Sequence, residues 1–198
     1  RGPYEKGQMG LMDFEATILS VTKVTHDVTC IMLTRHDEFS FIPGQYGLVF
    51  LEDEGKPFTF TSTPDDAHLE LTVKEKGDFT AKLVRSRPGD TLTIRGPLGK
   101  DLNFSDDLSE VILVAGGSGI TPFISILRHV HQRGLDHRFM LFYANKTPDD
   151  VIYGQELEAY KNVRLIHAFS EEGTYVTQEL IQSNVDDPAR HTWLVCGP

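Results

Sequence analysis

Short apolar runs separated by turn residues fill the first half of the chain. The runs are rich in Val, Ile, Leu, Phe and Thr, and turn residues such as Glu54-Gly55 separate most of them, which is typical of short β-strands. One helical stretch, around residues 80–86 after Gly77, interrupts them. This pattern predicts a small antiparallel barrel or sandwich. The predicted strands are Phe14–Ser20, Val28–Leu33, Tyr46–Leu51, Phe58–Ser62, Leu69–Val73 and Thr91–Arg95.

The rhythm of the pattern changes in the second half. Here the apolar runs are continuous, as expected for strands that are buried on both faces. They alternate with helical stretches, which predicts a parallel sheet with crossover helices. We therefore predict an antiparallel β-barrel over residues 11–104 and an α/β domain over residues 105–198, with the boundary in the polar stretch 101–107. Residues 1–10 lack periodicity and are interpreted as a leader. The later strands are predicted at Val111–Ala115, Phe139–Ala144, Val163–Phe169 and Trp193–Val195, and the helices at Pro122–Gln132, Gln155–Tyr160 and Val176–Ile181.

A glycine-rich segment follows the first strand of the second half. Gly116, Gly117 and Gly119 allow a sharp turn and a close approach to a ligand. Thr121 suits the N-cap of the next helix and Pro122 its first turn, and such a helix end favours an anion such as a pyrophosphate. The segment is neither a standard Rossmann fingerprint nor a P-loop. A plain glycine turn stays open as an alternative.

The first half carries residues suited to a flat, phosphorylated ligand. Phe58 can stack on a planar ring, and the hydroxyl of Thr59 beside it can hydrogen-bond a ring nitrogen. Lys56 can meet a phosphate as a point charge, and Gly77 followed by Thr80 suits a second anion site between a loop and a helix. Alternatively, Phe58 is a core residue and Lys56 a solvated charge.

Together these elements resemble the ferredoxin–NADP reductase-like family of flavoenzymes over almost the whole chain. Four motifs occur in that family's order: Lys56-Pro57-Phe58-Thr59, Gly77 to Thr80, Gly116 to Pro122 and a final Cys-Gly-Pro. The resemblance implies a barrel that binds FAD and an α/β domain that binds NAD(P)H. It implies catalytic positions for Thr59, near flavin N5, and Cys196, near the nicotinamide. The cofactor-binding residues that it implies are Lys56, Pro57, Phe58, Thr59, Lys74, Gly77, Asp78, Phe79, Thr80, Gly116, Gly117, Gly119, Thr121, Pro122, Cys196, Gly197 and Pro198.

The chain departs from the family's usual pattern at three points. Lys56 stands where an Arg is usual, which loses bidentate phosphate recognition, and Phe58 stands where a Tyr is usual. The Pro-Phe-Thr triplet resembles the branch with ferric reductases and NADPH oxidases. Relatives continue beyond the Cys-Gly-Pro that ends at Pro198, so the α/β domain is expected to be incomplete at its C-terminal end.

The resemblance implies hydride transfer from NAD(P)H to FAD and electron transfer onward to ferredoxin, flavodoxin or a similar protein, or to a small or metal acceptor. Two alternatives stay open: a reductase component of a larger assembly, of the oxygenase or dihydroorotate dehydrogenase type, and a non-enzymatic flavin-binding module. NADH is mildly favoured, because Glu171 and Glu172 follow the third α/β strand and would repel a 2′-phosphate. Lys146 is the one candidate partner for that phosphate.

Composition further limits the classes of function that the chain can have. The net charge of −10 argues against a nucleic-acid binder, although seven basic residues against three acidic ones between Lys74 and Lys100 offer a docking area for phosphates or an acidic protein. Two cysteines, Cys30 and Cys196, are too few for a disulfide framework, and no metal site is expected. No apolar run approaches the roughly 18 residues of a membrane span. A cytoplasmic protein without a membrane segment is expected.

Overall fold

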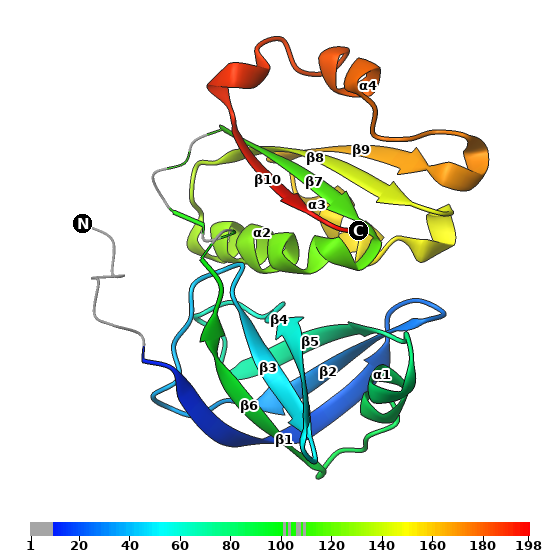
Figure 1. The fold of residues 1–198 in the computed structure, drawn as a ribbon. Helices are drawn as coiled ribbons and strands as arrows, with labels where there is room; N and C mark the ends of the chain where they lie inside the picture. Colours follow the sequence, from blue (N-terminus) through cyan, green and yellow to red (C-terminus); the bar gives the residue numbers. More distant parts are fainter. Residues whose placement is uncertain (1–9, 101, 103, 106–107, 109) are drawn as a thin grey trace.

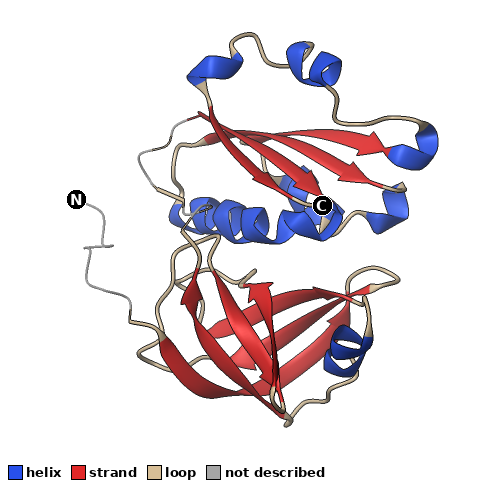
Figure 2. Cartoon of the chain, in the orientation of Figure 1, coloured by secondary structure: helices blue, strands red, loops and turns tan. Residues whose placement is uncertain are grey.

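The computed structural model describes residues 10–100, 102, 104, 105, 108 and 110–198. Figure 1 shows two sheets stacked one above the other, and Figure 2 shows that the lower part consists of strands and loops with one helix, while the upper part mixes strands and helices. The predicted fold class, an antiparallel barrel followed by a parallel α/β sheet, is confirmed.

The first half forms a strongly curled antiparallel sheet. Its strands are β1 (Met12–Lys23), β2 (Val28–Thr34), β3 (Tyr46–Leu51), β4 (Glu54–Thr59), β5 (His68–Lys74) and β6 (Thr91–Leu98), and its helix is α1 (Asp78–Leu83). The strand order is β4-β3-β6-β1-β2-β5. The chain after β4 meets β5 at an isolated bridge between Phe60 and Leu71, which brings the two edges of the curled sheet close to each other. Alternate residues of β6 are buried, as the period of two in a half-buried strand requires. Phe39, Phe41 and Phe60 pack against one another inside.

The second half is a parallel sheet with helices on both faces. Its strands are β7 (Glu110–Gly116), β8 (Arg138–Asn145), β9 (Val163–Phe169) and β10 (Thr192–Cys196), and its helices are α2 (Thr121–Arg133), α3 (Gly154–Ala159) and α4 (Gln178–Gln182). The order is β10-β7-β8-β9. Helix α2 lies between this sheet and the barrel, and α4 lies on the outer face (Figure 1). Val28 of β2 belongs to the apolar cluster beneath this sheet, so the two halves are packed together.

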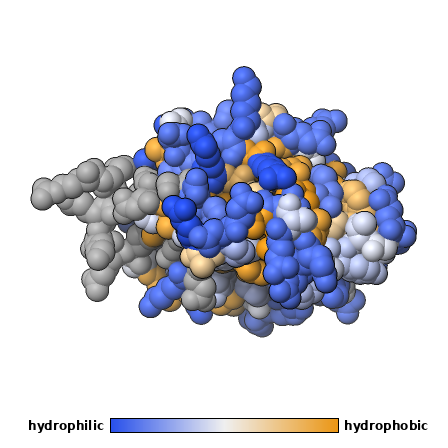
Figure 3. Space-filling view, turned by 90° about the horizontal axis from the view of Figure 1, so that it is seen from above, coloured by the Kyte–Doolittle hydropathy of each residue, from blue (hydrophilic) through white to orange (hydrophobic). Residues whose placement is uncertain are grey.

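The outer face of the parallel sheet is covered less completely than the inner one. Among the described residues, its cluster has three buried members, Ile112, Phe142 and Val185, with partly buried ones around them, and Val195 is 63% exposed. In the view from above, an apolar area lies among hydrophilic residues (Figure 3). Within the described chain, no helix has both the length and the apolar character needed to cross a membrane.

The predicted beginning of β4 is wrong. Glu54 and Gly55, interpreted as a turn, lie in the strand, and the turn falls at Glu52 and Asp53, where Glu52 has φ 54°. The strand also ends at Thr59 rather than continuing to Ser62. A strand can contain Pro57 here because β4 is an edge strand of the sheet. On its outer side no neighbouring strand needs a hydrogen bond from a backbone N–H, which proline lacks. Of the predicted leader and domain boundary, residues 1–9, 101, 103, 106 and 107 lie outside the described residues.

Candidate functional site

The glycine-rich segment and the C-terminal Cys-Gly-Pro meet at one edge of the parallel sheet. Strands β7 and β10 are parallel neighbours, with Cys196 paired to Ala115, so both chains leave the sheet at its carboxyl edge. A Cβ on Gly119 would lie 2.2 Å from the carbonyl oxygen of Cys196, and one on Gly197 would lie 2.9 Å from the nitrogen of Gly116. The two segments therefore pack backbone against backbone, at the edge where α/β sheets bind ligands.

The helical turn after β7 begins earlier than the sequence predicts. A 3-10 turn, Gly117–Ile120, runs directly into α2, so Thr121 already has helical angles of φ −56° and ψ −43° and is buried. The N-cap of α2 is Ile120, without a side-chain cap. The expectation that Thr121 caps the helix is therefore wrong, because a capping residue must stand outside the helix. Pro122 does lie in the first turn of α2, and it is buried.

Gly117 and Ser118 form the open part of this loop. Gly117 has φ 51°, and no atom lies within 4 Å of the position that a Cβ would take. Ser118 is exposed, and the sequence analysis missed it, although a hydroxyl inside a glycine loop is a usable signal for anion binding. The buried hydroxyl of Tyr143 donates to the Gly117 carbonyl at 3.2 Å, and burial raises the pKa of Tyr143. A protonated phenol thus holds the loop in place, and pyrophosphate binding by the loop stays a prediction.

The predicted flavin motif lies on β4, at the edge of the barrel. Phe58 stacks on Phe79, with ring centroids 6.0 Å apart and planes 19° apart. Lys56 Nζ lies 5.3 Å from the centre of the Phe79 ring and 3.0 Å from Glu54 Oε1. Phe58 and Thr59 are half-buried, whereas Phe79 is buried beneath them. Lys56 and Phe58 therefore stand beside Phe79, whereas Thr59, the next residue of β4, points to the opposite face of the strand. Flavin and phosphate contacts for Lys56, Phe58 and Thr59 stay predictions.

The loop before α1 is internally braced. Gly77 has φ 88° and open space at its Cβ position. The Thr80 hydroxyl accepts a hydrogen bond from the backbone N–H of Lys76 at 2.6 Å and donates one to the Gly77 carbonyl at 3.1 Å. Lys74 pairs with Asp27 at 2.9 Å. Thr80 and Lys74 thus already have protein partners, while Gly77 and the exposed Asp78 face open space; flavin contacts for all of them stay predictions.

The chain beyond β4 connects the predicted flavin motif to the glycine loop of residues 116–119 (the nucleotide loop). Ser62 follows Thr59 by three residues, and its carbonyl accepts a hydrogen bond of 2.7 Å from Ser125 on α2. Thr63 donates to Gln132 of the same helix at 2.7 Å. Helix α2 begins where the glycine loop ends. The segment that follows the flavin motif is therefore hydrogen-bonded to the helix that follows the glycine loop.

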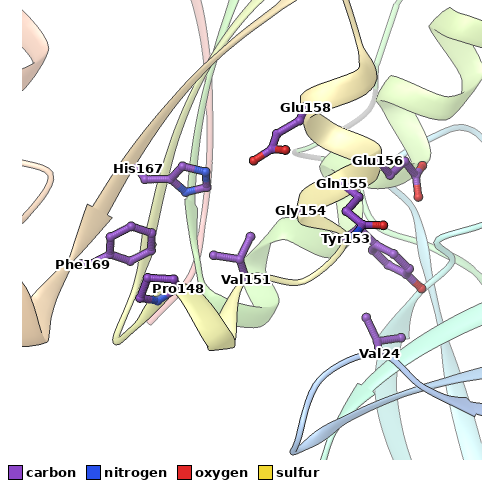
Figure 4. A pocket seen from close by; sticks show the side chains of 10 residues that line it. All are labelled: Val24, Pro148, Val151, Tyr153, Gly154, Gln155, Glu156, Glu158, His167 and Phe169. Atoms are coloured by element: carbon purple, nitrogen blue, oxygen red, sulfur yellow. The ribbon is translucent and has the colours of Figure 1, made fainter.

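A separate pocket of about 710 Å³ lies near the ends of β8 and β9. In Figure 4 His167 and Phe169 project from β9 on one side, and α3 forms the other. The two rings are stacked, 5.2 Å apart. None of the predicted cofactor residues lines this pocket, whose walls are Val24, Pro148, Val151, Tyr153, Gly154, Gln155, Glu156, Glu158, His167 and Phe169.

Comparison with known proteins assigns each half of the chain. Residues 13–99 match the model of an FAD-binding domain, and residues 113–198 match that of an oxidoreductase NAD-binding domain. The sequence is 28% identical over 169 residues to NADH-cytochrome b5 reductase 2 of Mycosarcoma maydis, covering 74% of this chain and 48% of the relative. It is 30% identical over 153 residues to the gamma subunit of sulfhydrogenase 2 of Pyrococcus furiosus, covering 73% and 52%.

The same fold occurs in solved structures. A ferredoxin NADP+ reductase from Neisseria gonorrhoeae, with bound FAD and NADP, superposes with a TM-score of 0.75 at 21% identity, over 92% of this chain and 84% of that one. The chain spans about half the length of the curated relatives that it matches.

Proposed function

Because this chain belongs to the ferredoxin–NADP reductase-like family of flavoenzymes, we propose that it oxidises NAD(P)H and passes the electrons through FAD to a separate acceptor. FAD, when bound, supplies the hydride acceptor and the means of releasing electrons onward. The observation that carries the proposal is the contact between Ser62 and Ser125, which joins the flavin strand to the helix of the nucleotide loop.

The chain's own residues have distinct tasks in this proposal. Phe58 packs on the flavin ring, Thr59 hydrogen-bonds it near N5, and Lys56 meets the phosphates. At the other edge, the backbone N–H groups of Gly117 and Ser118 hold the pyrophosphate of the nicotinamide nucleotide. Cys196 lies against the same loop and positions the nicotinamide. Its thiol stays protonated, because burial raises its pKa, and it therefore does not act as a nucleophile.

Replacing Lys56 is expected to weaken flavin retention, whereas replacing its ion-pair partner Glu54 is not. Lys56→Ala removes the cation and should weaken FAD binding by about 1–3 kcal/mol, the range for a hydrogen bond to a charged group. Glu54→Gln removes the carboxylate 3.0 Å from Lys56 Nζ, so FAD should bind equally well or a few-fold more tightly. Fluorescence titration of the apoprotein measures both. Equal affinities for parent and Lys56→Ala would make Lys56 a mere surface charge.

We propose NADH as the preferred hydride donor, because acidic residues lie at the end of β9. Glu171 and Glu172 are exposed there, and the backbone of Glu171 bonds that of Lys146 at 3.1 Å, so Lys146 stands beside an acidic pair. The ring of Tyr175, 59% exposed, places its hydroxyl 3.4 Å from the Ser170 carbonyl and offers a flat surface to an adenine.

Glu171→Arg is expected to raise the ratio of kcat/KM for NADPH over that for NADH by about tenfold or more, since a tenfold change needs only about 1.4 kcal/mol. Steady-state kinetics with both nucleotides measure it. Glu15→Arg on the exposed side of β1 makes the same charge change elsewhere and should leave the ratio unaltered. A parent that prefers NADPH tenfold would overturn the assignment.

The acceptor is proposed to be a protein or a small or metal acceptor outside this chain. One relative is named for cytochrome b5 and another is a subunit of a sulfhydrogenase, and the latter favours the second candidate, a reductase component of a larger assembly. Both cysteines are free, which supports a reducing compartment such as the cytoplasm.

An anaerobic titration with NADH and NADPH after reconstitution with FAD, followed by a screen of acceptors, tests the function. Reduction of the flavin supports an enzyme. A protein that binds FAD but is reduced by neither nucleotide would be a non-enzymatic flavin module instead.

A further inference from the structure

A largely buried ion network joins the two halves directly behind the flavin strand. Arg128 projects from α2 toward the barrel, and its side chain is 18% exposed. Its Nη1 donates to the Thr61 carbonyl at 3.0 Å and to Glu70 Oε1 at 2.6 Å. Its Nε and Nη2 donate to the two carboxylate oxygens of Glu156 at 2.7 and 2.9 Å. One guanidinium therefore holds the chain after β4, strand β5 and helix α3 at the same time.

The groups around Arg128 are tied to one another as well. Glu70 Oε1 also accepts hydrogen bonds from the hydroxyls of Thr61, at 2.8 Å, and Tyr153, at 3.2 Å, and the ring of Tyr153 lies 4.8 Å from the guanidinium carbon. Burial alone would raise the pKa of Glu156, but the hydrogen bonds and charge of Arg128 outweigh burial and lower it. Such a satisfied network of charged groups is stiff.

The network lies on a short path between the two cofactor motifs. Thr61 follows Thr59 by two residues, and Phe60 between them is fully buried in the barrel. Arg128 follows Thr121 by seven residues, about two turns along a helix that starts at the glycine loop. A displacement of Arg128 would therefore shift both the flavin strand and the nucleotide loop.

We propose that Arg128 is a positioning residue for hydride transfer, which fixes the placement of the flavin strand relative to the nucleotide loop. The proposal rests on the function proposed above. Only a guanidinium suits the position, because its planar fork donates in several fixed directions, whereas a lysine ammonium is a compact point charge on a flexible stem. A residue that only contributed electrostatic attraction between the two halves would not need this geometry.

Arg133 provides a matched control on the same helix. Its Nε and Nη2 donate to the two oxygens of Asp65 at 2.6 and 2.7 Å, so it also joins α2 to the barrel. The pair is more exposed, with 26% of the Arg133 side chain and 42% of the Asp65 side chain accessible, and such surface pairs contribute little.

The test compares Arg128→Lys, Arg128→Ala and Arg133→Ala after loading with FAD. Arg128→Lys should slow flavin reduction at saturating NADH by about tenfold or more, since a misplacement of about 1 Å can cost on the order of a hundredfold. Flavin content and the KM for NADH should stay near those of the parent, and the charge-transfer absorbance of the two stacked cofactor rings should weaken. Arg133→Ala should match the parent. Arg128→Ala leaves two carboxylates without their cation and is expected to lower Tm markedly, so the lysine variant carries the kinetic test.

Arg128→Lys that is reduced at the parent's rate, with unchanged charge-transfer absorbance, would overturn the proposal. Amide hydrogen exchange of the cofactor-free protein supplies a readout that is independent of activity. Residues 59–63 should exchange faster in Arg128→Lys than in Arg133→Ala, and equal exchange would count against the network as a brace. If neither nucleotide reduces the parent, the proposed function fails, and the exchange experiment still decides whether Arg128 braces the two halves.

Discussion

Gly119→Ala is expected to abolish rapid flavin reduction by NADH and to destabilise the α/β half. The new Cβ would lie 2.2 Å from the Cys196 carbonyl oxygen and 2.8 Å from the Cα of Gly197. Both are backbone atoms, so the loop and the end of β10 must separate by about 1 Å to reach ordinary contact. Overpacking of this kind costs about 1–3 kcal/mol, and an ~1 Å misplacement of a positioning element can slow a reaction about a hundredfold. Thermal unfolding and single-turnover reduction measure the two effects.

Gly134→Ala is the control for this experiment. Gly134 has φ 60° at the end of α2, and a Cβ there would meet no atom within 4 Å. The substitution therefore adds the strain of a left-handed conformation, about 1–2 kcal/mol, without a collision. Its reduction rate should equal that of the parent. A Gly119→Ala protein with the stability and the reduction rate of the parent would show that the packing of the loop on β10 is unimportant.

Cys196→Ala is expected to slow flavin reduction about ten- to a hundredfold, the scale of an ~1 Å misplacement, while flavin binding and stability change little. Cys196 is the half-buried last residue of β10, and its backbone carbonyl lies against the glycine loop. Removing the sulfur leaves room for the nicotinamide to shift without creating a large cavity. Single-turnover reduction of the FAD-loaded protein by NADH measures the effect.

Val195→Ala truncates the neighbouring side chain on the same strand, which is 63% exposed and points to the opposite face. This variant should be reduced at the rate of the parent. Equal rates for Cys196→Ala and the parent would make Cys196 a packing residue.

Periodicity predicts the order and type of the elements well, since strands β3 and β9 have the predicted bounds. Periodicity gives the wrong bounds where a glycine is needed for close packing and not for a turn. Gly55 looks like a turn residue, yet it lies opposite Phe50, whose ring occupies the space of a Cβ, only 2.5 Å away. Such cross-strand covering of a glycine by an aromatic ring depends on register, which a sequence pattern does not contain.

The sequence shows the local motifs of the candidate site but not its contacts between distant residues. The four motifs are local in sequence, and their order could be read directly. Arg128, by contrast, meets Glu70 and Glu156 across 58 and 28 residues, and no spacing rule relates these positions. The sequence predicts a phosphate contact for Gly119, but the structure buries Gly119 against Cys196, so packing alone requires a glycine there. A cofactor contact for Gly119 stays a prediction.

The primary kinetic isotope effect on flavin reduction measures whether hydride passes from the nicotinamide to FAD in this protein. FAD-loaded protein is mixed anaerobically with NADH, or with NADH carrying deuterium at one of the two C4 positions, and the flavin absorbance near ~450 nm is followed. Hydride transfer to FAD predicts complete reduction and a slower rate for one of the two deuterated forms, because hydride then leaves one defined face of the nicotinamide. A protein that binds FAD but is not reduced, or is reduced at the same rate by both deuterated forms and by NADH at every concentration, would contradict it.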